Sequence, residues 1–324
     1  MKFSKLTEYF EKLEATSSRL ALIDILSDLF KNTPKEEIEK IVYLIQGRLA
    51  PFFVPLEIGM AEKTVAKSIA QAFGVKAEEV TKEFNRLGDM GKAAQQLGQK
   101  SKVKSQKSDV SVEEVHKILT EIANTKGNGT VEIRQKLLSE LLSKMDPISA
   151  KHLVRIPLGN VRLGIGDPTV LDALATAKLG DKSKRKLLEG AYNRTSDLGL
   201  IAKTLWEKGL PAVQKLEVRI GSPIRSELCE RLPSPEKVIE KMTTDSQGSL
   251  QGVDAQYKYD GFRVQIHKDQ DNIRIFSRNL EEMTHMFPEL IKAAQTQVNA
   301  KTAILDGEAL AYSPESEEFL PFQE

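Results

Sequence analysis

The spacing of apolar residues changes near residue 216, and this change constrains the fold more than any other feature of the chain. Before it, apolar residues recur every three or four positions, as in Phe3, Leu6 and Phe10, which is the period of a helix with one buried face. After it, apolar and polar residues alternate over short segments, as they do in half-buried strands. The sequence therefore predicts an all-helical part followed by a part that contains an antiparallel sheet.

Local signals place several helix boundaries. Asp167 is expected as an N-cap with Pro168 at the first helical position, because proline needs no amide partner there. Thr33-Pro34, with two glutamates behind it, is another expected helix start. We expect helical segments within residues 3–13, 20–30, 130–142, 169–177 and 236–242.

The stretch from Gln95 to Ser108 is rich in lysine, lacks acidic residues and contains few large apolar ones. Such a composition is typical of a solvated link between helices, and this is the interpretation we favour. A strap that contacts phosphates is the alternative. Neither interpretation decides the function.

The boundary between the two parts is expected near residues 215–222, which gives a helical domain over residues 1–216 and a sheet-containing domain over residues 217–324. In the second part, alternating residues predict strands, and one segment between the last two strands has the helical period. The expected strands are 253–268, 272–276 and 303–312, and the expected helix is 283–298.

Composition bounds the class of protein. At about 150 residues per domain, the 324 residues correspond to about two domains. Forty-seven basic residues against 46 acidic ones give a net charge of +1, which neither indicates nor excludes a nucleic-acid partner. The single cysteine, Cys229, excludes an intrachain disulfide and a cysteine-based zinc site. No apolar run is long enough to span a membrane, and we expect a cytoplasmic protein.

The chemically richest segment covers residues 253–266. Its apolar residues occupy odd positions before Asp260-Gly261 and even positions after it, and Asp-Gly is a strong signal for a two-residue hairpin turn. In that hairpin Lys258 would face Arg263. Two cations opposite one another are destabilising unless they share an anion. The pair therefore predicts either a solvated turn or a phosphate-binding site in which Lys258 is the nucleophile.

Two later segments favour the phosphate-binding interpretation. Arg278 follows a strand on the same side as Arg274. Asp306 and Glu308 are two residues apart, so both carboxylates project from one strand face. Carboxylates near a polyphosphate commonly hold a divalent cation or a ribose hydroxyl. Together with Lys258, these residues supply a nucleophile, phosphate contacts and a metal ligand.

In their order and spacing, these segments resemble the motifs of ATP-dependent DNA ligases. The hexapeptide from Lys258 to Arg263 resembles the K-x-D-G-x-R signature of covalent nucleotidyltransferases, and residues 276–281 and 305–309 are similar to two later ligase motifs. The resemblance implies a multidomain α and α+β protein. Its residues 217–324 would form part of a nucleotidyltransferase domain with an ATP-grasp-like antiparallel sheet.

The helical part resembles the archaeal replicative type of these ligases. The similar segments are residues 162–174, 191–199 and 225–232, and they imply a helical DNA-binding domain over residues 1–216. The candidate DNA contacts are Arg162, Gly164, Gly166, Asn193 and Arg194. Glycines let backbone amides approach a phosphate, and a helix N-terminus adds its positive end. A tight turn between helices is the alternative explanation for the two glycines.

By resemblance, Lys258 attacks the α-phosphorus of ATP, releases pyrophosphate and becomes lysyl-AMP. The AMP passes to the 5′-phosphate at a nick in double-stranded DNA, and the 3′-hydroxyl displaces it to seal the strand. The family's nucleotide contacts map to Gln256 for the adenine base, Arg263 and Arg278 for ribose or phosphates, and Glu308 for the ribose and the metal. The implied cofactors are ATP, as AMP donor, and Mg²⁺. The implied roles are DNA replication, repair and recombination.

The chain departs from the family pattern at two points. Gln256 stands where the family usually has glutamate, and a glutamine carbonyl accepts a hydrogen bond from adenine without charge assistance. The chain also stops at Glu324, so we expect the family's adenine-stacking aromatic, its lysine-x-lysine motif and its OB-fold domain to be absent. These departures predict a truncated fragment whose pocket is incomplete.

Two alternatives stay open. One is a fragment that binds nicked or duplex DNA without sealing it, and the other is an RNA ligase or capping-type nucleotidyltransferase. The helical part disfavours the second, and it also disfavours an NAD-dependent ligase. We expect a monomer that associates with the nucleoid and has no membrane partner. A sliding clamp is a further candidate partner that the sequence does not reveal.

Overall fold

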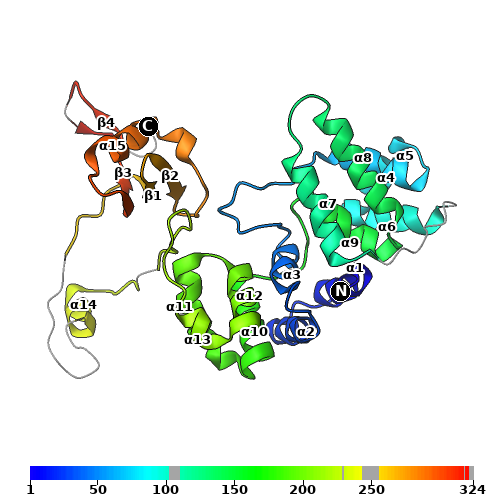
Figure 1. Ribbon diagram of the computed structural model, residues 1–324, viewed down its shortest axis with the longest axis horizontal. Helices are drawn as coiled ribbons and strands as arrows, with labels where there is room; N and C mark the ends of the chain where they lie inside the picture. The colour runs from blue at the N-terminus through cyan, green and yellow to red at the C-terminus, as the bar shows by residue number, and fades with distance from the viewer. Residues whose placement is uncertain (102–109, 228–229, 243–254, 317, 321–324) are drawn as a thin grey trace. The chain divides into compact units, whose positions relative to one another are not determined.

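The computed structural model describes residues 1–101, 110–227, 230–242, 255–316 and 318–320. The chain forms two compact units, Met1–Val218 and Arg219–Glu324 (Figure 1). The first unit is built of helices, and the second contains the strands. None of the helices in the described ranges is both long and apolar enough to cross a membrane.

Helices make up the first unit, and the longer connections between them include residues 46–61 and 156–166. In chain order the helices are α1 (Phe3–Glu14), α2 (Arg19–Lys31), α3 (Ile38–Ile45), α4 (Glu62–Phe73), α5 (Ala77–Leu87), α6 (Met90–Lys100), α7 (Val112–Asn124), α8 (Thr130–Ser143), α9 (Pro147–Arg155), α10 (Asp167–Leu179), η1 (Lys182–Lys184), α11 (Arg185–Thr195), α12 (Leu198–Lys208) and α13 (Leu210–Gln214). The predicted N-terminal helices and the helix after Gly129 are confirmed. Phe3, Leu6 and Phe10 are buried in one continuous core of this unit, as their spacing predicts.

Polar side chains fix where several of these helices begin. Ser111 Oγ accepts a hydrogen bond from the backbone N–H of Glu114 at 3.1 Å, at the start of α7. Asp146 accepts from the N–H groups of Ile148 and Ser149 at 2.9 and 3.0 Å, at the start of α9. Such caps satisfy backbone donors that have no partner inside the helix, so the sequence alone defines these ends.

Three boundary predictions are wrong in detail. The helix expected to start at Thr33-Pro34 begins at Ile38, with Glu37 as its N-cap, so the two glutamates precede the helix instead of lying in its first turn. The N-cap of α10 is Gly166, one residue earlier than predicted. The Asp167 carboxylate instead accepts hydrogen bonds from Gln46 Nε2 at 3.1 Å and Tyr192 Oη at 2.5 Å, and so ties α10 to its neighbours. Residues 95–100, predicted as part of a link, belong to α6, in which Leu97 is buried. Residues 102–109 of that stretch lie outside the described residues.

A cluster of charged side chains is buried where α1, α6 and α9 meet. The guanidinium of Arg155, only 2% exposed, donates to Glu14 at 2.8 and 3.0 Å and to Asp89 at 2.5 Å. Burial raises the pKa of Glu14, but hydrogen bonds from Arg155 and Lys151 outweigh it and lower this pKa to about 2. Each charge has an opposite partner, which is the condition under which a buried charge is tolerated.

Part of this cluster has the spacing of a metal site. Among the described residues, Glu11, Glu14 and His152 present ligand atoms within 4.8 Å of one another. However, Lys151 Nζ lies 2.5 Å from Glu11 Oε1 and 2.7 Å from Glu14 Oε2. Since an ammonium already contacts both carboxylates, we assign the group a structural role.

Burial lowers the pKa of His152 from 6.5 to about 4, although its hydrogen bond to Glu11 opposes the shift. We therefore expect the free energy of unfolding to decrease as the pH falls from 6.5 towards 4, because only the unfolded chain binds a proton on this histidine there. The full shift corresponds to about 3 kcal/mol. Urea unfolding at pH 7, 5.5 and 4 measures it. His152→Gln keeps an N–H for Glu11 and should flatten the dependence; an equally steep dependence in that variant would contradict the assignment.

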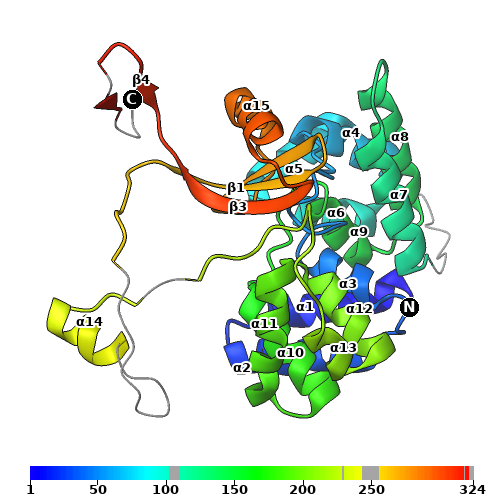
Figure 2. The ribbon, with the colours of Figure 1, turned by 60° about the vertical axis from the view of Figure 1, so that its left-hand side comes forward.

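The second unit contains a small antiparallel sheet. Its elements are α14 (Pro235–Met242), β1 (Phe262–Asp269), β2 (Asn272–Ser277), η2 (Thr284–Met286), α15 (Pro288–Gln297), β3 (Thr302–Ala309), β4 (Tyr312–Ser313) and β5 (Glu318–Phe319). The strand order is β2-β1-β3, and β4 pairs separately with β5. Helix α15 lies along one face of the three-stranded sheet (Figure 2), where Val264, Ile273, Ile275 and Ala294 form a small core.

The hairpin predicted at Asp260-Gly261 is wrong. Residues 255–260 lie outside the strands, and neither residue of the dipeptide has the positive φ that a type I′ turn requires. β1 begins at Phe262 and pairs with β2 on one edge and with β3 on the other. A tight hairpin to β2 therefore takes one edge of β1, and a long-range pairing with β3 takes the other. Arg263 lies opposite Glu308 rather than opposite Lys258.

Candidate active site

The sheet carries an open pocket of about 820 Å³. This volume lies within the range of about 300–1,000 Å³ that is common for small-molecule sites. Its walls come from the segment before the strands, from the start of β1, from the residues that follow β2 and from β3. The five predicted nucleotide contacts all line it: Gln256, Lys258, Arg263, Arg278 and Glu308.

Strand pairing explains why residues so far apart in sequence meet here. Arg263 on β1 lies opposite Glu308 on β3, and Arg278 directly follows β2, which pairs with the other edge of β1. Side chains two residues apart share a face of a strand. Arg263 and Glu308 therefore project to the face opposite Val264 and the core under α15.

Asp306 fixes the orientation of Arg263. The Arg263 Nε–H donates to Asp306 Oδ1 at 3.2 Å, and Nη2 donates to Oδ2. Two parallel hydrogen bonds of this kind fix the plane of a guanidinium as well as its position. The predicted pairing of Arg263 with Lys258 is thus replaced by an ion pair between neighbouring strands.

Lys258 lies on the exposed segment 255–260 that leads into β1. Gly261 allows this segment to pass close to β3. A Cβ at position 261 would lie 2.5 Å from the carbonyl oxygen of Ala309 and 2.9 Å from Cγ of Glu308, which no side chain tolerates. The glycine of the motif is therefore needed for close packing at this point, and not for a hairpin turn.

Other pocket residues were not predicted as site residues. Asn279 and Glu281 line the pocket and lie inside the motif at residues 276–281, so their position in that motif was the available signal. Ser226 and Glu227 also line it. They precede β1 by more than thirty residues, and no periodicity or turn signal links them to Lys258.

Three of the predicted DNA contacts lie in the loop before α10. Arg162 has a φ of +54°, and its guanidinium donates to the carbonyl oxygen of Gly88 at 3.1 Å and lies 3.3 Å from Asp89. Gly164 has a φ of +66° with open space where a Cβ would be, and Gly166 caps the helix. The loop therefore places two glycines directly before the N-terminus of α10. Backbone N–H groups at such a position can bind a phosphate.

The other two predicted DNA contacts, Asn193 and Arg194, lie near the end of α11. The Arg194 guanidinium donates to the carbonyl oxygens of Leu216 at 2.7 Å and Gln214 at 3.1 Å. It thus holds the chain after α13, a structural role that the sequence did not indicate. The hydrogen bond between Tyr192 and Asp167 links α11 to the first residue of α10.

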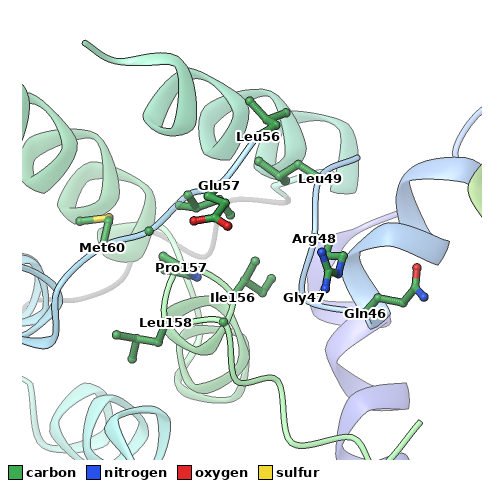
Figure 3. Close-up of a pocket in the computed structure, with 13 residues that line it drawn as sticks. Gln46, Gly47, Arg48, Leu49, Leu56, Glu57, Met60, Ile156, Pro157 and Leu158 are labelled. Carbon is green, nitrogen blue, oxygen red and sulfur yellow. The ribbon is translucent and has the colours of Figure 1, made fainter. Parts of the chain in front are cut away.

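A second cavity, of about 360 Å³, lies in the helical unit between residues 46–60 and the end of α9 (Figure 3). The backbone N–H of Met60 donates to the carbonyl oxygen of Pro157 at 3.2 Å and joins its two walls. Arg48 and Glu57 are the charged residues among those that line it. Because the described residues that line this cavity include no lysine, cysteine, serine or histidine, the pocket at Lys258 is the better candidate for a reaction centre.

The chain thus combines a helical unit with an antiparallel sheet, and the pocket on the sheet places an exposed lysine near two arginines and a glutamate. Two family models match the chain: "DNA ligase N terminus" over residues 2–175 and "ATP dependent DNA ligase domain" over residues 226–324. The chain belongs to the ATP-dependent DNA ligase family.

The similar proteins include several that are named DNA ligase or probable DNA ligase. The chain is 44% identical over 323 residues to a probable DNA ligase of Dictyoglomus turgidum, and these residues are 100% of this chain and 53% of that protein. It is 43% identical to a DNA ligase of Saccharolobus solfataricus and 41% identical to one of Nitrosopumilus maritimus, with 100% of the chain and 54% of each relative covered. The chain thus spans about half the length of the curated relatives it matches.

Proposed function

We propose that the protein containing this chain is an ATP-dependent DNA ligase that seals nicks in duplex DNA, with Lys258 as the nucleophile. The observation that carries this proposal is the meeting of Lys258, Arg263 and Glu308 in one pocket of nucleotide size, in a chain of the ligase family. Lys258 and Arg263 belong to one motif, and the pairing of β3 with β1 brings Glu308 to the same pocket. We further propose that residues 1–216 bind DNA and that residues 217–324 belong to the adenylation domain.

The reaction has three displacements at phosphorus. The neutral amine of Lys258 attacks the α-phosphorus of ATP, the bond to the pyrophosphate oxygen breaks, and the amine loses a proton. An oxygen of the 5′-phosphate at the nick then attacks the phosphorus of lysyl-AMP, and the lysine leaves and regains a proton. Finally the 3′-hydroxyl attacks the 5′-phosphorus, and AMP leaves. Positioning and charge stabilisation supply most of the rate enhancement in such transfers.

The pocket residues have separate roles in this proposal. Arg263, held by Asp306, and Arg278 contact the phosphates or the ribose, since a guanidinium suits both. Gln256 accepts a hydrogen bond from the adenine amino group. Glu308 contributes oxygen atoms of the type that Mg²⁺ prefers, and it lies directly opposite Arg263. Bound there, Mg²⁺ would offset the negative charge of the phosphates.

Transfer of label from α-labelled ATP to the protein, followed by sealing of a nicked duplex, tests the function as a whole. Labelled protein that releases AMP on addition of nicked DNA supports the proposal. A protein that binds nicked DNA but takes up no label would favour the alternative, a DNA-binding protein that does not seal.

Gln256 gives a specific prediction about nucleotide binding. Gln256→Glu should lower the KM for ATP several-fold, because a carboxylate accepts the hydrogen bond from the adenine amino group with charge assistance. The KM of label transfer measures this, with Gln295→Glu, far from the motif in sequence, as the matched control. An unchanged KM in Gln256→Glu would show that position 256 does not contact the base.

The helical unit gives a prediction about DNA. Because it has its own continuous core, residues 1–218 should fold alone and bind duplex DNA. The affinity should fall steeply with salt, by about 10³-fold or more between 50 and 200 mM if six phosphates are neutralised. Fluorescence anisotropy at several salt concentrations measures the slope. A salt-independent affinity, or no binding, would remove DNA binding from this unit. We also propose that the whole protein acts in DNA replication, repair and recombination at the nucleoid.

A further inference from the structure

The segment that opens the second unit begins with a tight turn. The backbone N–H of Ser222 donates to the carbonyl oxygen of Arg219 at 3.1 Å, and Gly221 between them has a φ of +84°. A positive φ at the third position of a turn is typical of type II and favours glycine. A Cβ at Gly221 would also lie 2.9 Å from Arg274 Nη1. The turn therefore packs directly against a side chain of β2.

Three side chains of the sheet bind the backbone of this segment. The Gly221 N–H donates to His267 Nδ1 at 2.8 Å, and Arg274 Nη1 donates to the Gly221 carbonyl oxygen at 3.2 Å. The Ile224 N–H donates to Gln265 Oε1 at 2.7 Å, and Gln265 Nε2 donates to the Ile224 carbonyl oxygen at 3.3 Å. The glutamine amide thus pairs with both backbone groups of one residue, as a neighbouring strand would.

The contacts require a single state of His267. Its Nδ1 accepts the Gly221 N–H, so the proton is on Nε2, which donates to Gln265 Oε1 at 2.9 Å. The side chain is fully buried and its ring lies edge-on to Phe276, with centroids 4.9 Å apart. Burial and the neighbouring Arg274 lower the pKa of His267 to about 4, which keeps the ring neutral and Nδ1 free to accept.

This set of contacts adjoins the nucleotide pocket on the same sheet face. Gln265 and His267 follow Arg263 at two-residue intervals on β1, so the three side chains share a face. On the bound segment, Ser226 and Glu227 come two and three residues after Ile224, and both line the pocket. One end of this face therefore holds the segment, and the other end forms the pocket that the segment helps to close.

We propose that Gln265 and His267 are positioning residues: they hold residues 219–227 against the sheet so that Ser226 and Glu227 form a wall of the Lys258 pocket. The proposal rests on the proposed function for the meaning of that pocket. It assigns no chemistry to either side chain, because neither lines the pocket itself. It predicts that loosening the segment will weaken nucleotide binding and leave the chemistry at Lys258 in place.

Amide hydrogen exchange tests the contacts without reference to activity. In the protein that carries this chain, Gln265→Leu should speed exchange at Ile224 and through residues 225–227 by about tenfold or more, since one net hydrogen bond corresponds to roughly a factor of ten. His267→Leu should do the same at Gly221. His267→Asn offers an acceptor in place of Nδ1 and should restore part of the protection.

Lys268→Met is the matched control on the same strand. Lys268 faces the other way and donates to the carbonyl oxygens of Ala294 at 2.8 Å and Val298 at 2.6 Å, at the end of α15. Its loss destabilises the unit without touching the bound segment. When the two proteins are compared under conditions of equal stability, Lys268→Met should show the same amide hydrogen exchange at residues 221–227 as the natural protein.

Label transfer supplies the second measurement. Gln265→Leu should raise the KM for ATP about tenfold with a nearly unchanged kcat, and Lys268→Met should change neither. If exchange at residues 221–227 is the same in Gln265→Leu and the natural protein, the proposal is wrong. It is also wrong if exchange responds but the KM does not. If the natural protein takes up no label at all, the proposed function is wrong. Amide hydrogen exchange at residues 225–227 then decides by itself whether Gln265 and His267 hold this segment against the sheet.

Discussion

We expect Lys258→Ala to abolish the transfer of label from α-labelled ATP to the protein, because none of the other described residues that line the pocket is a lysine. Lys258→Arg should fail as well, since a guanidinium stays protonated and cannot act as a nucleophile. Denaturing gel electrophoresis of the labelled protein measures the covalent adduct directly. Sealing of a nick that already carries a 5′-adenylate should survive both substitutions, because that last step does not use the lysine.

Lys301→Ala is the matched control for this experiment. Lys301 lies directly before β3 and is exposed, and it does not line the pocket. Its variant should take up label as the natural protein does. Continued labelling of Lys258→Ala would show that another residue forms the adduct, and the assignment of the nucleophile would then be wrong.

The second large effect is on stability. Arg155→Met should lower the free energy of unfolding by about 3–5 kcal/mol, because it removes one partner of a buried ion pair and leaves carboxylates without compensation. Asp89 is affected most, since its side chain is 2% exposed and bonds Arg155 at 2.5 Å. Urea unfolding followed by circular dichroism at pH 7 measures the change.

Arg86→Met provides the comparison. Arg86 also bonds a carboxylate, that of Glu83, but its side chain is 54% exposed. An exposed pair adds little to stability, so this variant should unfold close to the natural protein. If the two variants unfolded alike, the buried cluster at α1, α6 and α9 would not be a main determinant of the stability of the helical unit.

The sequence predicted α1, α2, α8 and α14 well because the determinants of these helices are local. The three-and-four spacing of Phe3, Leu6 and Phe10 leads directly to a buried face of α1, and a side-chain cap such as Asp146 is fixed by neighbours in the chain. The start of α10 shows the limit of such rules. Asp167 has the residue type of a cap, but its carboxylate bonds Gln46 and Tyr192 instead, and neither partner is near it in sequence.

The hairpin prediction failed for a related reason. Asp260-Gly261 and the change of parity around it are local signals, whereas the pairing of β1 depends on strands that follow it by several to about forty residues. Once β2 and β3 pair with the two edges of β1, no edge is left with which residues 255–260 could pair as the other strand of a hairpin. The small residue at 261 is still required, but for contact with Ala309.

In the candidate site, too, the features with local signals were predicted and those that depend on long-range contacts were not. Residues inside motifs, such as Lys258, Arg278 and Glu308, were found from the sequence, and the structure brings them to one pocket. The partners that orient or enclose them were not. The ion pair of Asp306 with Arg263 depends on the pairing of two strands. The position of Glu227 in the pocket wall depends on a segment that side chains of the sheet hold in place. Neither feature leaves a periodic pattern in the sequence.

The strand order β2-β1-β3 has a consequence for behaviour in solution. The outer edge of β2 is covered by the chain that follows it, since the Met283 N–H donates to the carbonyl oxygen of Ile275 at 2.8 Å. No strand in the described ranges pairs with the outer edge of β3, and this row of backbone donors and acceptors is a template for one more strand. A further strand of the same polypeptide would close that edge and keep the protein monomeric. Where the edge stays open, two copies can join through it, and self-association should increase with protein concentration.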